Sequence, residues 1–144
     1  MKNLIRLVAV AAMMMVGVGS AIAEDRTPSA PGAEVYVIAP RDGATVSNPV
    51  VVRFGLKGMG IAPAGVKFDN TGHHHLLIDT EVPGDLTQPL PVVENKVVHF
   101  GKGQTETALT LPPGKHTLQL VLGDSLHIPH NPAVVSKKIT ITVK

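Results

Sequence analysis

A two-residue alternation of apolar and polar side chains is the feature that most constrains the fold of this chain. Across residues 50–56 the even positions carry Val, Val, Phe and Leu, and the odd positions include Arg53 and Gly55. Across residues 139–143, Ile and Val alternate with Thr in the same way. Because successive side chains of a strand point to opposite faces of its sheet, both segments predict strands with one buried face.

Turn-forming residues divide the rest of the chain into further short strands. Segments rich in Gly and Pro predict turns or loops at 40–43, 58–72, 81–95 and 112–114, and Gly101 to Gln104 predicts a hairpin turn. Strands are then expected at 34–38, 50–56, 73–80, 96–100, 105–111, 118–122 and 139–143. About seven strands without a helical period between them predict an all-β fold, an immunoglobulin-like antiparallel β-sandwich.

The first 23 residues have the layout of a secretory signal peptide. Lys2 and Arg6 precede an uncharged run of 17 residues that ends in Ala21-Ile22-Ala23, a small-x-small cleavage site. The run is at the short limit for crossing a bilayer and no stop-transfer pattern follows, so no membrane span is expected in the mature form. We therefore expect a signal peptide at 1–23, a flexible segment at 24–33 and one sandwich domain at 34–144, in a periplasmic or secreted protein.

Composition excludes several classes of function. Two of the 13 Lys and Arg residues lie in the signal peptide, and the other 11 balance the 11 Asp and Glu, so no basic surface for nucleic acid is expected. The absence of Cys excludes disulfides, thiolate catalysis, Cys-based zinc sites and the Cys-ligated blue-copper site. With no Trp and four other aromatic residues, the chain is poorly supplied for stacking on sugars or bases.

All seven histidines lie between residues 73 and 130, and the predicted strand order brings most of them together. If successive strands are antiparallel, the loops before 73–80, after 96–100 and after 118–122 lie at one pole of the sandwich. Three loops then carry six histidines to that pole, and His116 falls at the other. The six are His73, His74, His75, His99, His127 and His130.

These histidines have the spacing that a metal site needs. His73 and His75 share one face of a strand, about 6.5 to 7 Å apart, and His127 and His130 flank a Pro in a short loop. Three or four neutral imidazoles suit Zn²⁺ or Cu²⁺. The sequence therefore predicts a copper or zinc site formed by His73, His75, His99, His127 and His130. The alternative is a hydrogen-bonded polar cluster that only holds the loops together.

The surrounding residues suggest supporting roles. Met59 offers a thioether that would favour Cu⁺ if it reached the site. His74 shares the parity of Leu76 and Ile78, which favours a core histidine over a ligand. His116 follows Pro-Pro-Gly, where a side chain bonded to the backbone would fix a corner of the sandwich. Three carboxylates are candidates to fix the tautomers of ligand rings: Asp79, Glu106 and Asp124.

Three separated motifs carry a family resemblance. They are GHHHLLID at 72–79, HFGxGQTE at 99–106 and LGDxxHxPHxP at 122–132. On these motifs the chain resembles a family of small exported bacterial proteins catalogued as domain of unknown function 4399, from about residue 55 to 144. The resemblance implies a periplasmic or secreted domain and no particular activity. Ala133 stands where the family pattern often has Pro, which implies a slightly less rigid loop.

Three hypotheses for the function follow. The first is a periplasmic protein that buffers or delivers copper or zinc through the histidines. The second is a metal-independent module that binds another envelope protein or polymer with the same pole. The third is a metal-dependent hydrolytic enzyme with Glu106 as the base. The chain has no nucleophile motif of the G-x-S-x-G type and no evident acid/base carboxylate pair, which disfavours an enzyme.

Overall fold

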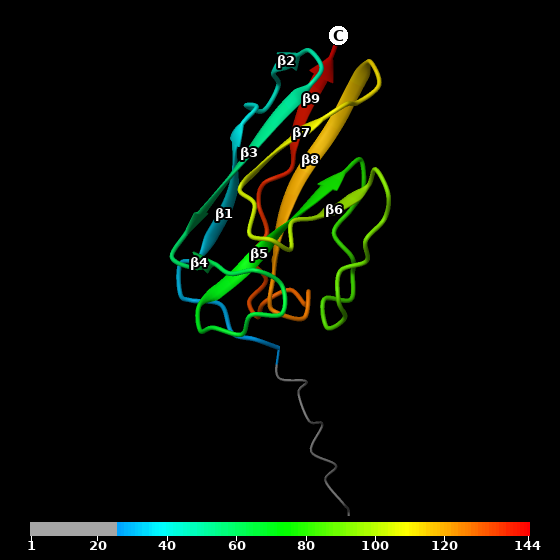
Figure 1. The fold of residues 1–144 in the computed structure, drawn as a ribbon. Helices are drawn as coiled ribbons and strands as arrows, with labels where there is room; N and C mark the ends of the chain where they lie inside the picture. Colours follow the sequence, from blue (N-terminus) through cyan, green and yellow to red (C-terminus); the bar gives the residue numbers. More distant parts are fainter. Residues whose placement is uncertain (1–25) are drawn as a thin grey trace, which may run out of the picture.

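The computed structural model describes residues 26–144, so the predicted signal peptide lies outside the described residues. Within this range the chain forms nine strands joined by loops and turns (Figure 1). They are β1 (Glu34–Ala39), β2 (Thr45–Val46), β3 (Val50–Lys57), β4 (Gly60–Ile61), β5 (Thr71–Ile78), β6 (Val97–His99), β7 (Glu106–Leu109), β8 (Gly114–Gly123) and β9 (Ile139–Val143). The same range contains no helix, and hence none long and apolar enough to cross a membrane.

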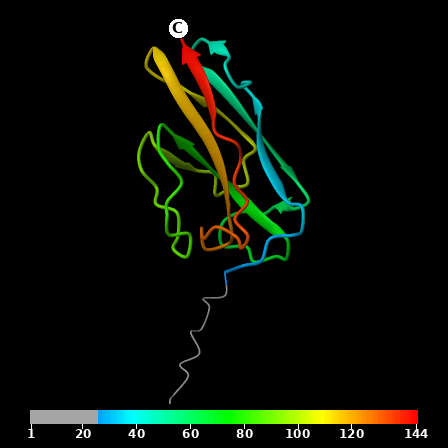
Figure 2. The same ribbon diagram turned by 180° about the vertical axis from the view of Figure 1, so that it is seen from behind.

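The strands form two sheets that pack face to face, as Figures 1 and 2 show from opposite sides. The smaller sheet has the order β1-β3-β7, and the larger has the order β2-β9-β8-β5-β4, with β6 also paired to β5. All pairings are antiparallel except those of the two-residue strands β2 and β4, which run parallel to β9 and β5. The predicted all-β antiparallel sandwich is confirmed.

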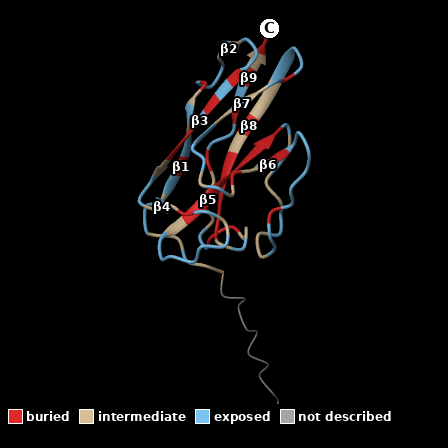
Figure 3. Ribbon diagram, viewed as in Figure 1, coloured by how far each residue is buried: buried red, intermediate tan, exposed pale blue. Residues whose placement is uncertain are grey.

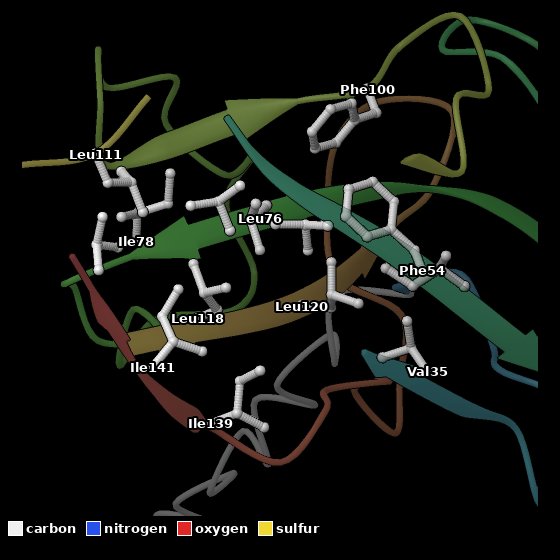
Figure 4. Close-up of a cluster of buried hydrophobic side chains, with 14 of the residues drawn as sticks. Val35, Phe54, Leu76, Ile78, Phe100, Leu111, Leu118, Leu120, Ile139 and Ile141 are labelled. Carbon is white, nitrogen blue, oxygen red and sulfur yellow. The ribbon is translucent and has the colours of Figure 1, made fainter. Parts of the chain in front are cut away.

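The core between the sheets is built from the alternating apolar positions. Val50, Val52 and Phe54 of β3 are buried, and their even-numbered counterparts on β8 and β5 meet them from the larger sheet (Figure 4). Phe54 and Phe100 face each other with ring centroids 4.8 Å apart. Burial of each such side chain is worth about 1.5 to 3 kcal/mol, so the period-two pattern is the main determinant of this fold.

Strand β5 is buried along nearly its whole length, on both faces (Figure 3). Leu76 and Ile78 lie in the core between the sheets, whereas Leu77 lies on the outer face of the larger sheet. There Leu77 packs with Leu90, Val97 and Val121 in a second apolar cluster. The outer face of β5 is thus covered by chain from the β5–β6 loop, and polar side chains on that face are removed from solvent.

The predicted hairpin around Gly101 to Gln104 is wrong. Strand β6 pairs with β5 in the larger sheet, and β7 pairs with β3 in the smaller one. Phe100 is buried in the core at the crossing, its N–H donates to the His74 carbonyl (3.1 Å), and the Phe54 N–H donates to Thr105 (2.8 Å). Burial of Phe100 between the sheets therefore directs the chain from one sheet to the other.

Strand boundaries differ from the prediction in smaller ways. Strand β8 begins four residues before the predicted start at 118, because Gly114 to Thr117 pair with β9. Alternation alone cannot reveal this extension, since its side chains are exposed or half-buried. Thr27 and Ser29, within the segment expected to be flexible, form hydrogen bonds with Asn131 and Pro132.

Candidate metal centre

Four of the predicted ligands form one cluster. One nitrogen atom from each of His73, His75, His99 and His127 lies within 4.8 Å of the corresponding atoms of the others. The Nε2 atom of His73 is 3.1 Å from Nδ1 of His127 and 3.2 Å from Nε2 of His99. We call these four residues the histidine cluster. It lies on the outer face of the larger sheet, where β5 begins and where β6 and β8 end.

Sheet register positions three of the four rings. His73 and His75 are two residues apart on β5, and their ring centroids are 4.8 Å apart. His99 lies directly opposite His75 in the β5–β6 ladder, with ring centroids 5.2 Å apart. Cross-strand neighbours are held at such distances by the backbone, so these rings meet as a direct result of strand pairing.

A tight turn in the β8–β9 loop brings in the fourth ring. The His127 N–H donates to the Asp124 carbonyl (3.0 Å), and the Asp124 N–H donates to the Ile128 carbonyl (2.9 Å). His127 has a φ of 68°, in the left-handed region that few residues other than Gly adopt. Its ring centroid lies 4.6 Å from that of His99. A strained backbone at this point orients the ring toward the sheet.

Glycines of the sequence motifs leave the space that the rings occupy. A Cβ atom on Gly101 would lie 2.3 Å from Cε1 of His99, and one on Gly123 would lie 2.6 Å from Cε1 of His75. A Cβ atom on Gly72 would lie 2.9 Å from a ring atom of His130. Such distances are shorter than any normal contact, so the cluster requires glycine at positions 101 and 123, and the packing of His130 requires it at position 72. Sequence reasoning noted the motifs but missed this role.

The hydrogen-bonding capacity of the rings is not satisfied within the protein. Nε2 of His73 faces two other ring nitrogens, yet a neutral imidazole nitrogen has either one proton or one lone pair and can pair with only one of them. Both nitrogens of His75 and Nδ1 of His73 are buried without a partner. An unpaired buried polar atom costs about 1 to 3 kcal/mol. Hydrogen bonds within the protein therefore leave three ring nitrogens of this cluster unpaired.

The spacing of the nitrogens suits a coordinated ion. Four nitrogens placed tetrahedrally at about 2.0 to 2.1 Å from zinc would lie about 3.3 Å from one another. The separations of 3.1 and 3.2 Å from Nε2 of His73 are close to this value. All four ligand nitrogens lie within 4.8 Å of one another, so modest movements of the rings would bring them to this spacing.

Burial lowers the pKa of three of the rings, those of His73, His75 and His99. Removal from solvent, together with the neighbouring rings, lowers the pKa of His73 to about 4 and that of His75 to about 3. Burial and the adjacent His127 ring also lower the pKa of His99. Neutral imidazole is the form that binds a metal, so at ordinary pH these ligands need not lose a proton first.

Two of the three histidines outside the cluster are also buried. His130, the fifth predicted ligand, donates from Nε2 to the Thr71 carbonyl (3.1 Å). His74 lies on the inner face against Phe54, with ring centroids 5.1 Å apart, and burial lowers its pKa to about 4. The parity argument thus separated His74 from His73 and His75 as expected.

The remaining candidates have other partners. His116 contacts Asp79 (2.6 Å) and donates to the Pro112 carbonyl (2.7 Å), which fixes the corner before β8 as expected. Glu106 pairs with Arg53 (3.2 Å), and Asp124 accepts hydrogen bonds from loop amides. None of the three candidate carboxylates forms a hydrogen bond with a ring of the histidine cluster. Met59 packs against the core.

Comparison with known proteins gives a family and no activity. The sequence profile described as a domain of unknown function (DUF4399) matches residues 52–144. No curated protein and no solved structure matches this chain.

Proposed function

The chain belongs to the DUF4399 family, and because that description assigns no activity, we propose a function from the histidine cluster itself. The protein is an exported metal-binding protein that holds one copper or zinc ion and serves to buffer or deliver it. The observation that carries this proposal is the convergence of four imidazoles, two of which, His73 and His75, have buried nitrogens without a partner within the protein. Export rests on the signal-peptide pattern of residues 1–23.

The ligand atoms of the cluster favour a divalent metal ion. The cluster contains four imidazoles and no carboxylate, and the chain has no Cys. Imidazole suits Zn²⁺ and Cu²⁺, whereas Cu⁺ is selected by thiolate and thioether ligands. Met59 packs in the core rather than joining the cluster, so the proposed cargo is Zn²⁺ or Cu²⁺.

The arrangement favours storage over catalysis. A catalytic zinc keeps three protein ligands and one open position for water or substrate, whereas a closed site has four protein ligands. Four rings converge here, and His73 and His75 are 0% exposed. The candidate base Glu106 is paired with Arg53 on the exposed surface of the smaller sheet. A substrate would therefore find neither an open coordination position nor a base.

Titration of the metal-free mature protein with Zn²⁺ and Cu²⁺ tests the proposal. We expect binding of one equivalent, measured by calorimetry and by elemental analysis of protein purified without chelators. His75→Ala should weaken binding by more than the roughly 10- to 100-fold that loss of an outer-shell partner costs. His116→Ala is the matched control, since His116 lies outside the cluster, and should bind as the wild type does. Absence of binding, or equal effects of the two variants, would favour the metal-independent module.

A further inference from the structure

The first described residues of the chain run along the loop that carries His127. The Arg26 guanidinium donates to the carbonyls of Pro129 (3.0 Å) and His130, and the Asn131 N–H donates to the Thr27 carbonyl (2.9 Å). Ser29 donates from its N–H to Asn131 (3.2 Å) and from its hydroxyl to Pro132 (2.8 Å). We call residues 26–29 the amino-terminal clasp. Figures 1 and 2 show it, in blue, at the same end as the orange loop.

One bond of the clasp reaches the turn around His127. The Thr27 hydroxyl donates to Oδ2 of Asp124 at 2.6 Å. The other carboxylate oxygen of Asp124 accepts the N–H groups of Leu126 (2.9 Å) and Ile128 (3.0 Å). These residues flank His127 on both sides. Thr27 thus fixes the carboxylate that in turn fixes the left-handed turn.

We propose that Thr27 is a positioning residue for the metal ion, and that its bond to Asp124 sets how long the ion stays bound. This inference rests on the proposed metal-binding function. His127 is the one cluster member placed by a loop, whereas the other three are placed by paired strands. Its turn has a left-handed residue at its centre and is held by side-chain bonds to Asp124. Loosening Asp124 frees His127 first and leaves the sheet-borne rings in place.

The test is the rate at which a chelator removes Zn²⁺ from the full mature protein. Thr27→Val keeps the shape of the side chain and removes the hydroxyl, and Thr27→Ser keeps the hydroxyl. Loss of a hydrogen bond to a charged group predicts roughly tenfold faster dissociation and weaker affinity for Thr27→Val. Thr27→Ser should behave as the wild type does. Equal rates for Thr27→Val and the wild type would overturn the inference.

Two further measurements separate a positioning role from general stability. Ser29→Ala removes a clasp bond to Pro132, away from Asp124, and should lower the melting temperature without changing the dissociation rate. With Co²⁺ in place of Zn²⁺, Thr27→Val should show a weaker ligand-field spectrum, because the fourth nitrogen is lost more often. Equal dissociation rates in Thr27→Val and Ser29→Ala would leave only a structural role and overturn the proposal.

Hydrogen exchange in the metal-free protein distinguishes failure of this inference from failure of the proposed function. The amides of Leu126 and Ile128 should lose protection in Thr27→Val and keep it in Thr27→Ser. A wild-type protein that binds no Zn²⁺ overturns the proposed function and the inference with it. If the wild type binds Zn²⁺ normally and amide exchange in Thr27→Val is unchanged, only the proposed positioning role of Thr27 is overturned.

Discussion

His127 combines a left-handed backbone conformation with a place in the histidine cluster. Its left-handed backbone costs an ordinary residue about 1 to 2 kcal/mol, although His adopts this region more often than most. The ring that this conformation orients contacts His73, whose Nε2 already faces another ring. Without an ion, neither the backbone nor the ring nitrogens are at their most favourable, and this combination is typical of functional sites.

His127→Gly should separate binding from stability. Gly adopts a φ near 68° without steric cost. The metal-free variant should therefore unfold within about 1 kcal/mol of the wild type in a urea titration, because relief of strain offsets the greater freedom of the unfolded chain. Added Zn²⁺ should no longer raise its melting temperature. A variant that still gains the full wild-type shift would remove His127 from the ligand set.

The pKa of His116, which lies outside the cluster, is raised, whereas those of His73 and His75 are lowered. Its hydrogen bond to Asp79 raises its pKa, with a further contribution from the Pro112 carbonyl, against the effect of burial. A raised folded-state pKa stabilises the fold fully below the unfolded value of about 6.5, and this contribution is lost as the pH rises through the folded value.

Asp79→Asn tests this pH dependence. Asn tolerates the left-handed φ of 50° at this position and can still accept the Thr117 N–H, so mainly the charge is lost. Because Asp79 is partly exposed, the loss of stability should not exceed about 1 kcal/mol. The difference from the wild type should be largest below pH 6.5 and shrink at higher pH, with Zn²⁺ affinity unchanged. A pH-independent difference would show that His116 is not charged.

At the scale of elements, strand alternation predicted which histidines share a face of the sheet. It could not predict which strands pair or where the rings meet. Alternation placed His73 and His75 on one face and His74 on the other, because side-chain parity is local. It could not reveal that β6 pairs with β5, since pairing depends on contacts between distant segments. The predicted strand order placed these histidines at one pole, but it could not show that four of them meet on the outer face of the larger sheet. The exclusion of His130 depends on the turn at residues 124–128, which no periodicity encodes.

Gly123→Ala tests the fit between β8 and the site. The added Cβ would displace the His75 ring, which is enclosed on all sides, so overpacking should cost about 1 to 3 kcal/mol of stability. Zn²⁺ affinity, measured by competition with a chelator, should fall at least tenfold. Gly84→Ala is the control, because nothing lies within 4 Å of its Cβ position. Similar affinities for both variants would contradict the ring geometry described above.

At the scale of the whole molecule, the cluster links parts of the chain that only the sandwich brings together. The rings come from β5, β6 and the β8–β9 loop, and the Leu90 N–H donates to the His127 carbonyl (2.9 Å), which adds the β5–β6 loop. An ion bound here would hold three of these segments directly, and the fourth through the backbone bond to His127. Since the unfolded chain lacks this site, binding energy becomes stability of the fold.

Zn²⁺ should therefore raise the melting temperature of the wild-type protein. At a free concentration of 100 times Kd, one site adds about 2.7 kcal/mol of stability, a shift of roughly 10 °C for a domain of this size. Scanning calorimetry with and without Zn²⁺ measures this shift, and EDTA should reverse it. A melting temperature that responds to neither Zn²⁺ nor Cu²⁺ would favour the metal-independent interaction module.

If the histidine cluster holds an ion as proposed, the complete burial of His73 and His75 would impose an order on its release. An acceptor would approach from the side of the two partly exposed rings, His99 and His127, and the bond to His127, which lies in a turn, would break first. The two rings on β5 would release last. Transfer would then begin with the opening of one turn in the donor protein.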